Sequence, residues 1–168
     1  MAAQHRANHD MLTGLANRAL FDENLSHQLA TCRRTDRELA IVYIDLDGFK
    51  PVNDAHGHAI GDEMLCMVAR RLKEAIRESD LAARLGGDEF ALILVHTGLA
   101  AAQALALKVT NSLAIPYKIG ALTLEISASI GIACYPESGT ASEALWLRAD
   151  AAMYKAKAAG KRRYAVAS

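Results

Sequence analysis

The stretch Ala83–Leu92, ARLGGDEFAL, places two glycines and two carboxylates between two apolar runs. One run covers residues 81–85 and the other covers residues 90–95. Both have the length and composition of buried strands. Glycine adopts the positive φ that a tight turn requires, and so short a connection leaves no room for a crossover. The sequence therefore predicts an antiparallel hairpin with residues 86–89 at its tip.

The chemistry of this tip has two interpretations. Bare backbone N–H groups at Gly86 and Gly87 allow an anion to approach closely. Asp88 and Glu89 would repel that anion unless a divalent cation lies between them, which points to a metal that bridges carboxylates and phosphate. The alternative is a solvated hairpin tip, which this short motif taken alone favours, because short motifs have many false positives.

A second stretch, YIDLDGFKPVND at residues 43–54, carries two carboxylates at the end of a strand predicted over residues 39–46. A carboxylate at the end of a buried strand is costly unless it is paired or bound to a metal. If this strand lies beside the hairpin, Asp45 meets the hairpin carboxylates in an oxygen-rich site suited to Mg²⁺ or Mn²⁺. We expect Asp45 and Asp47 on opposite faces, with Asp47 a surface carboxylate or a turn former.

The residues beyond this strand have the polarity of a nucleotide site. Lys50 fits a phosphate contact, and it also fits a solvated lysine. Asn53 and Asp62 flank a predicted loop, AHGHAIG at residues 55–61, whose two histidines we interpret as ordinary loop residues. A carboxylate accepts both N–H donors of the guanine edge, and an amide serves the neighbouring edge. Asp62 alone also fits a helix N-terminus, where the dipole favours a carboxylate.

The rest of the chain supplies further helices and strands. Apolar residues recur at helical spacing in some segments, and short apolar runs predict strands in others. The predicted helices cover residues 17–34, 60–78, 99–113 and 141–159. Residues 122–135 predict a strand or a bent pair of strands, with Gly131 a possible bulge, and residues 162–166 predict a last short strand. This order of elements predicts an α+β fold with one central sheet.

The composition fits one domain and excludes several classes of protein. Of the 168 residues 52% are hydrophobic, enough for one sizeable core. Lys+Arg and Asp+Glu number 19 each, so the chain lacks the basic excess that nucleic-acid binding requires. Three widely spaced cysteines without a CxxC pair argue against disulfides and a zinc site and favour a reducing, cytoplasmic setting.

The sequence also indicates the domain bounds and whether a membrane-spanning segment is present. No apolar stretch reaches the roughly 20 residues that span a bilayer, although a full-length protein could be anchored in a membrane elsewhere. We expect residues 1–9 to be the trailing end of an upstream linker or helix and residues 10–168 to form the domain.

Five motifs follow one another along the chain: DMLTGLANR (10–18), DLDGFKPVNDAHGHAIGDEML (45–65), RLGGDEF (84–90), SIGIACYP (129–136) and ADAAMYKAKAAGKRRY (149–164). Together they resemble the GGDEF-domain family of diguanylate cyclases over nearly the whole chain. The resemblance implies a central, mostly antiparallel sheet flanked by helices, as in nucleotidyl cyclases and polymerase palms. It implies an enzyme that condenses two GTP molecules into cyclic di-GMP and releases two pyrophosphates.

The resemblance also assigns roles at the metal site. Asp45, Asp88 and the backbone carbonyl of Leu46 would bind Mg²⁺ or Mn²⁺, and Glu89 would support them. Asp88 is in addition the candidate base for the ribose 3′-hydroxyl.

The residues implied to contact GTP are Lys50, Asn53, His58, Asp62, Gly86, Gly87, Lys157 and Lys161. Lys50 would stabilise charge on the phosphates, while Asn53 and Asp62 would hold guanine. Lys157 and Lys161 would reach the terminal phosphates. The family more often has arginine at position 161, and lysine lacks its bidentate fork, so we expect a weaker grip on the triphosphate with the chemistry retained.

The stretch Arg77-Glu-Ser-Asp80 ends five residues before the glycine pair and resembles the family's inhibitory product site. We therefore expect cyclic di-GMP to bind there and inhibit synthesis. Without that spacing, Arg77 would be a cation in the last turn of a helix.

One domain presents one GTP, so the resemblance implies a transient homodimer for catalysis and fusion to a sensor domain. A competing hypothesis is a catalytically weak GTP-binding module that controls a fused EAL phosphodiesterase domain. The intact Asp45, Lys50, Asp88 and Glu89 argue against such degeneration. A third hypothesis is an adenylate cyclase-like or polymerase-like enzyme. Asp62 and Asn53, which match guanine, argue against adenine.

Overall fold

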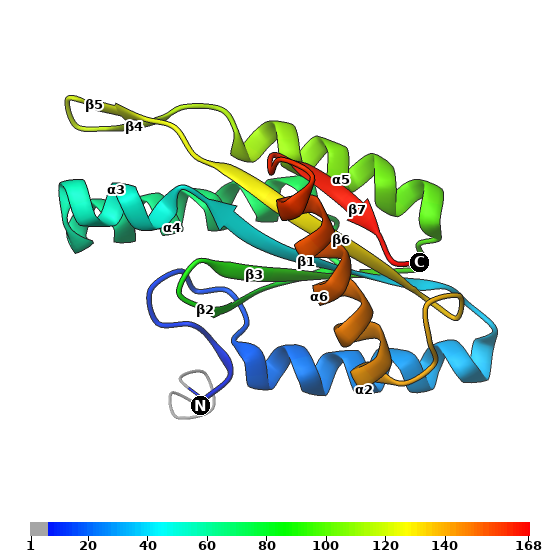
Figure 1. Ribbon diagram of the computed structural model, residues 1–168. Coiled ribbons are helices and arrows are strands. Elements are labelled where there is room, and N and C mark those ends of the chain that lie inside the picture. Colours follow the sequence, from blue (N-terminus) through cyan, green and yellow to red (C-terminus); the bar gives the residue numbers. More distant parts are fainter. Residues whose placement is uncertain (1–6) are drawn as a thin grey trace.

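The centre of the molecule is one five-stranded sheet, seen in a computed structural model that describes residues 7–168 (Figure 1). Its strands are β1 (Leu39–Asp47), β2 (Leu81–Gly86), β3 (Glu89–Val95), β6 (Ser127–Tyr135) and β7 (Arg163–Val166). Their order is β2-β3-β1-β6-β7, and only the β6–β7 pair is parallel. A separate hairpin joins β4 (Tyr117–Ile119) to β5 (Leu122–Leu124). The predicted α+β fold with a mostly antiparallel sheet is confirmed.

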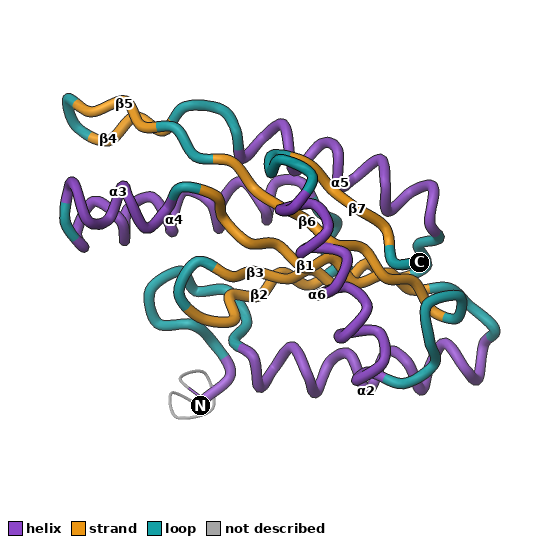
Figure 2. Tube along the Cα trace, in the orientation of Figure 1, coloured by secondary structure: helices purple, strands orange, loops and turns teal. Residues whose placement is uncertain are grey.

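Helices cover both faces of this sheet (Figure 2). They are α2 (Arg18–Thr35), α3 (Phe49–His56), α4 (His58–Ala75), α5 (Leu99–Leu113) and α6 (Ser142–Ala158). Apolar side chains of α4 and α5 pack on one face, and those of α2 and α6 pack on the other. The domain is therefore a sheet between two helical layers.

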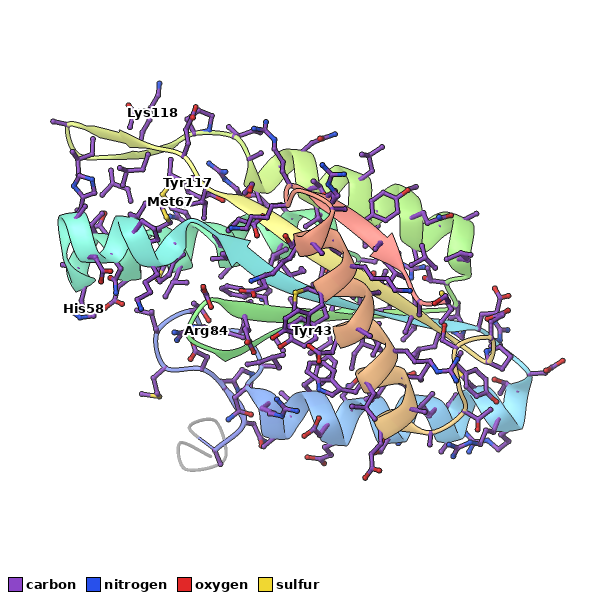
Figure 3. All side chains as sticks on the ribbon, in the orientation of Figure 1. Tyr43, His58, Met67, Arg84, Tyr117 and Lys118 are labelled. Atoms are coloured by element: carbon purple, nitrogen blue, oxygen red, sulfur yellow. The ribbon has the colours of Figure 1, made fainter. Side chains whose placement is uncertain are left out.

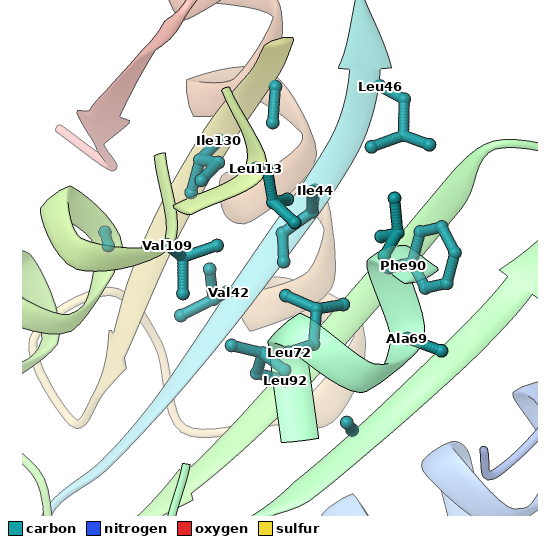
Figure 4. Packing of buried hydrophobic residues seen from close by; sticks show 14 of the residues in the cluster. Val42, Ile44, Leu46, Ala69, Leu72, Phe90, Leu92, Val109, Leu113 and Ile130 are labelled. Carbon is teal, nitrogen blue, oxygen red and sulfur yellow. The ribbon is translucent and has the colours of Figure 1, made fainter. Parts of the chain in front are cut away.

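The central strand β1 is buried along its whole length, because it lies between two strands and two helical layers. Its side chains alternate between the layers. Val42 and Ile44 join the α4–α5 layer, where Figure 4 shows them beside Leu72 and Val109. Tyr43 belongs to the opposite layer with α2 and α6. Burial on both faces explains why the strand is almost continuously apolar.

The ends of several elements differ from the prediction. Residues 55–61 are no loop, because α3 and α4 meet there at a single residue, Gly57, with φ +91°. The helix predicted to run to residue 78 ends at Ala75. Asn17 precedes α2 as its N-cap and accepts a hydrogen bond from the N–H of Leu20 at 3.0 Å.

Gly131 lies in regular pairing opposite Tyr43, so the predicted bulge is wrong. A Cβ at this position would lie 3.1 Å from the carbonyl carbon of Ala149 and closer still to the backbone N of Met153. Both atoms belong to α6, which therefore rests directly on β6 at this glycine. Residues 122–135, for which the sequence predicts a strand or a bent pair of strands, form β5 and β6 in two different sheets.

The predicted upstream segment, residues 1–9, lies in part outside the described residues, which begin at residue 7. Within residues 7–9, the carbonyl of Asn8 accepts the N–H of Asn17 at 2.9 Å, and His9 forms a bridge with Ala16. These three residues therefore already pair with the start of the domain.

Candidate active site

The hairpin tip and the end of β1 meet, as the sequence predicts. Asp45 pairs directly with Glu89 in the β1–β3 register. The N–H of Leu46 donates a hydrogen bond of 3.1 Å to the carbonyl oxygen of Asp88, which fastens the turn to the strand end. We call residues 86–89 the signature turn. Two carboxylates from distant parts of the sequence, Asp45 and Asp88, thus lie at one end of the sheet.

Charged side chains at this end of the sheet shift one another's pKa values. Burial raises the pKa of the Asp88 carboxyl, and the neighbouring Asp45 carboxylate raises it further. Lys157 reaches in from α6 and forms an ion pair with Asp45. Burial alone would lower the pKa of Lys157, but its hydrogen bond to Asp45 and the charges of Asp47 and Asp88 raise it. The site therefore concentrates negative charge around one ammonium group.

The donor set fits a small hard cation. Within residues 7–168, no three or more His, Cys, Asp or Glu side chains are grouped closely enough to enclose a metal. Mg²⁺ does not need such a cage, because it commonly binds one or two carboxylates and takes water and substrate phosphate for the remainder. The close, partly buried carboxylates of Asp45 and Asp88 match that requirement, and a cation between them would relieve their repulsion.

Glu89 is held by Tyr43, a residue that no sequence motif singles out. The hydroxyl of Tyr43 donates a hydrogen bond of 2.8 Å to Oε2 of Glu89. Burial and the Glu89 carboxylate raise the pKa of Tyr43 far above its ordinary value, so the phenol stays protonated. Figure 3 shows Tyr43 between the sheet and α6. In the sequence Tyr43 is one more residue of an apolar run, which is why its role was missed.

The prediction that Asp45 and Asp47 face opposite sides is wrong. Residues two apart on a strand share a face, and both carboxylates act on Lys157. Asp47 is also no surface residue, since it is only 7% exposed. Its donors are the hydroxyls of Ser127 and Ser129, each at 2.8 Å, and the backbone N–H of Arg162 at 3.2 Å. Asp47 therefore anchors the turn that follows α6.

The remaining predicted phosphate contacts lie near these elements. Lys50 is exposed in the first turn of α3, directly after β1. Lys161 is exposed in the turn anchored by Asp47, where it and Arg162 both have positive φ, +64° and +50°. In the described part of the chain neither Lys50 nor Lys161 forms an ion pair with these carboxylates, and Lys157 is the lysine paired with Asp45.

The predicted guanine-binding residues lie on α3 and α4. The side-chain amide of Asn53 is 3.0 Å from Nδ1 of His58, which joins the two helices across Gly57. A Cβ at Gly61 would collide with the Asn53 side chain, so this glycine makes room for the amide. Asp62 lies one residue further and lines a hollow of about 580 Å³.

The signature turn is also tied to the N-terminal segment. Arg84 donates from Nη1 to Oδ1 of Asp10 and from Nε to the carbonyl of Gly87, both at 3.0 Å. The Arg84–Asp10 ion pair is mostly buried. Both residues lie inside the motifs quoted above, but nothing in their spacing showed that they meet.

The two residues of the predicted product site, Arg77 and Asp80, lie together at the opposite end of β3. Arg77 lies beyond the end of α4 and donates to both carboxylate oxygens of Asp80, at 3.1 and 2.9 Å. Asp80 also accepts from the backbone N–H groups of Arg77 and Val95. The Asp80 side chain is 3% exposed, whereas that of Arg77 is 56% exposed. Asp80 is therefore saturated, and Arg77 is the member of the pair that faces solvent.

The family model described as "Diguanylate cyclase, GGDEF domain" matches residues 7–163. The chain belongs to the GGDEF family. Among similar proteins of Pseudomonas aeruginosa, the bifunctional diguanylate cyclase/cyclic di-GMP phosphodiesterase MucR is 47% identical over 93% of this chain, and the diguanylate cyclase TpbB is 45% identical over 96%.

Solved GGDEF structures have the same fold. A variant of P. aeruginosa TpbB comprising only the GGDEF domain superposes with a TM-score of 0.92 at 42% identity, covering 95% of this chain and 94% of that one. The coiled coil and GGDEF domain of DgcB from Caulobacter crescentus, in complex with c-di-GMP, gives 0.90 at 28% identity, covering 99% and 88%.

The GGDEF chain spans only part of its curated relatives, 23% of MucR and 38% of TpbB. Across residues 7–168, none of the helices combines the length and apolar character needed to cross a membrane.

Proposed function

We propose that this GGDEF domain is a Mg²⁺-dependent diguanylate cyclase that joins two GTP molecules into cyclic di-GMP and releases two pyrophosphates. The observation that carries the proposal is the meeting of Asp45 and Asp88 with Lys157 where β1 ends at the signature turn. Relatives whose names include diguanylate cyclase, MucR and TpbB, support it.

In this proposal Asp45, Asp88 and the carbonyl of Leu46 hold Mg²⁺ or Mn²⁺, with Glu89 in support. The cation would supply positive charge that offsets the negative charge developing on the transferred phosphate. Asp88 accepts the proton of one ribose 3′-hydroxyl as its oxygen bonds to the α-phosphorus of the other GTP. The bond between the α-phosphorus and the bridging oxygen breaks, and pyrophosphate leaves.

In this proposal GTP is bound at its guanine base and at its phosphates. Asn53, Asp62 and His58 would hold guanine. The backbone of Gly86 and Gly87 is open, because no heavy atom lies within 4 Å of the place where either Cβ would be. A phosphate can therefore approach the N–H groups of the turn.

Three lysines would carry the phosphate charge in this proposal. Lys50 lies directly after β1, Lys157 already lies at the carboxylates, and Lys161 is presented by the turn that Asp47 anchors. Lysine at 161 would bind as a point charge, without the fork of arginine.

Catalysis in this scheme requires two copies, since each domain presents one GTP, so we propose a transient homodimer. We also propose that cyclic di-GMP inhibits synthesis at the Arg77–Asp80 pair. Because the Asp80 oxygens are occupied, Arg77 would make the contact through its exposed guanidinium while Asp80 holds it in place. The complex of DgcB with c-di-GMP supports product binding by such domains.

Within a longer protein, residues 10–168 would be the cyclase domain and the residues before them a connection to a sensor. We propose a cytoplasmic site of action, which the three free thiols Cys32, Cys66 and Cys134 support. The second candidate is a regulatory domain that binds GTP without turnover beside an EAL phosphodiesterase domain. The bifunctional name of MucR favours keeping that candidate.

Incubation with GTP and Mg²⁺, followed by chromatography for cyclic di-GMP, decides between these candidates. Product in the wild type, and none in Asp88→Ala, supports the cyclase. Tight GTP binding without product, tested on a dimerised fusion as well as on the domain alone, supports the regulatory domain.

A further inference from the structure

The ring of Tyr43 is buried and packed against the aromatic side chain of Trp146. Tyr43 is 5% exposed in the layer between β1 and the helices α2 and α6. Its ring lies against the indole of Trp146, with centroids 4.6 Å apart. Phe21 of α2 contacts the same indole edge-on at 5.6 Å. Close packing of this kind restricts the movement of the ring and so restricts where the phenol oxygen can lie.

Packing alone does not account for the hydroxyl. The neighbours of Tyr43 on the same face of β1, Leu39 and Ile41, are apolar, and a phenylalanine ring would fill the same space. A buried hydroxyl is costly unless it has a partner, and Glu89 Oε2 at 2.8 Å is that partner. The hydroxyl is thus matched to one carboxylate oxygen of the signature turn.

The geometry also shows which part of Glu89 stays available. The Tyr43 hydrogen bond engages Oε2, whereas within residues 7–168 no hydrogen bond or ion pair engages Oε1. Glu89 pairs with Asp45 across β1 and β3, so its free oxygen belongs to the same end of the sheet as the carboxylates of Asp45 and Asp88. A carboxylate that is held in this way loses little conformational freedom when a cation arrives.

We propose that Tyr43 is a positioning residue that sets the Glu89 carboxylate for the divalent cation of the cyclase site. The inference rests on the proposed function and deepens it, because it names the residue that orients one of the acidic groups. Tyr43 does not touch the substrate in this scheme. It acts on the cation through Glu89 alone.

The test is the substitution Tyr43→Phe, which removes one oxygen and keeps the ring against Trp146. The matched control is Tyr117→Phe, since Tyr117 is also buried and its hydroxyl donates to the carbonyl of Leu113 at the same 2.8 Å. Tyr117 belongs to the opposite helical layer, away from Glu89. Thermal unfolding of both variants measures the general cost of losing a buried hydroxyl.

Cation binding is measured by electron paramagnetic resonance of Mn²⁺, in the presence of a GTP analogue with a methylene group between its α- and β-phosphates. This analogue cannot release pyrophosphate, so binding is observed without turnover. We expect Tyr43→Phe to weaken Mn²⁺ binding by about 10-fold to 100-fold, the usual range for the loss of an outer partner of a metal ligand. Tyr117→Phe should bind Mn²⁺ like the wild type.

A double-mutant cycle with Glu89→Ala tests whether Tyr43 affects cation binding through Glu89. If Tyr43 acts through Glu89, removal of its hydroxyl has no further effect once that carboxylate is gone. Equal Mn²⁺ binding by Tyr43→Phe and the wild type overturns the inference, as does an equal loss in Tyr117→Phe. A wild type that binds Mn²⁺ with the analogue but makes no cyclic di-GMP from GTP contradicts the cyclase function instead, so the two failures are distinguishable.

Discussion

Replacement of Gly131 by alanine should displace α6 and, with it, Lys157. The added Cβ would lie within 3.1 Å of the Ala149 carbonyl carbon and nearer still to two other backbone atoms of α6. Real Cβ atoms essentially never approach heavy atoms below 3.0 Å. Backbone atoms cannot rotate aside as a flexible side chain does, so the helix must retreat by about 1 Å in a close-packed interior.

Two magnitudes follow from this displacement. Overpacking of a well-packed core costs up to about 3 kcal/mol. For a domain of this size that cost corresponds to a fall in Tm of about 6–12 °C. Because Lys157 belongs to the same helix and pairs with Asp45, cyclase activity should fall by about 100-fold, the usual cost of a 1 Å misplacement.

The assay is thermal unfolding together with the initial rate of cyclic di-GMP synthesis. Gly120→Ala is the matched control, because Gly120 has φ +60° in the turn between β4 and β5 with nothing within 4 Å of the added Cβ. Its cost is limited to backbone strain of about 1 kcal/mol, and its rate should be unchanged. A Gly131→Ala variant with the wild-type Tm and rate would refute the close approach of α6 to β6.

Three further predictions concern the proposed roles. Asp45→Ala and Asp88→Ala should each abolish synthesis while the far-ultraviolet circular dichroism stays that of the wild type; synthesis at the normal rate by either would contradict the cation site. Calorimetry with Ca²⁺ in place of Mg²⁺ should show GTP binding at least 10-fold tighter than ATP, because the guanine N–H donors satisfy Asp62 while adenine leaves the acceptors of Asp62 and Asn53 unpaired. Equal affinities would contradict the guanine-binding roles of both residues. Arg77→Ala should lose cyclic di-GMP binding and raise the plateau of product without changing the initial rate, as measured by calorimetry and progress curves; product binding of wild-type strength would reduce the pair to a structural contact.

The elements that could be predicted from the sequence are those with one strong local signal. The helix at residues 99–113 and the hairpin around the signature turn are confirmed, because an alanine- and leucine-rich run and a Gly-Gly turn have few alternatives. Residues 55–61 were harder. Two glycines there suggest a loop, but Gly57 alone interrupts the helices, and Gly61 lies inside α4 to make room for Asn53.

The candidate site was predictable in outline and not in its supports. Asp45 and the signature turn carry motifs, so their meeting could be expected from adjacent strands. The predicted opposite faces of Asp45 and Asp47 conflict with strand geometry itself, because residues two apart share a face. The burial of Asp47 could not be predicted, since its donors Ser127 and Ser129 lie 80 or more residues away in the sequence. Tyr43 was invisible for a related reason: its hydrogen bond depends on the register between β1 and β3, which no local pattern specifies.

The tether between Arg84 and Asp10 has a consequence for how such a domain is built into longer proteins. It brings the point where the polypeptide enters the fold to within one side chain of the turn at Gly87. The C-terminus leaves beside β7, at the far end of the sheet from that turn (Figure 1). A module fused to the N-terminus would therefore lie only a few contacts away from the signature turn and the carboxylates of the candidate site. A module fused to the C-terminus would have to act along the length of the sheet. In designed chimeras, a stimulus-responsive domain therefore belongs at the N-terminus and a passive label at the C-terminus.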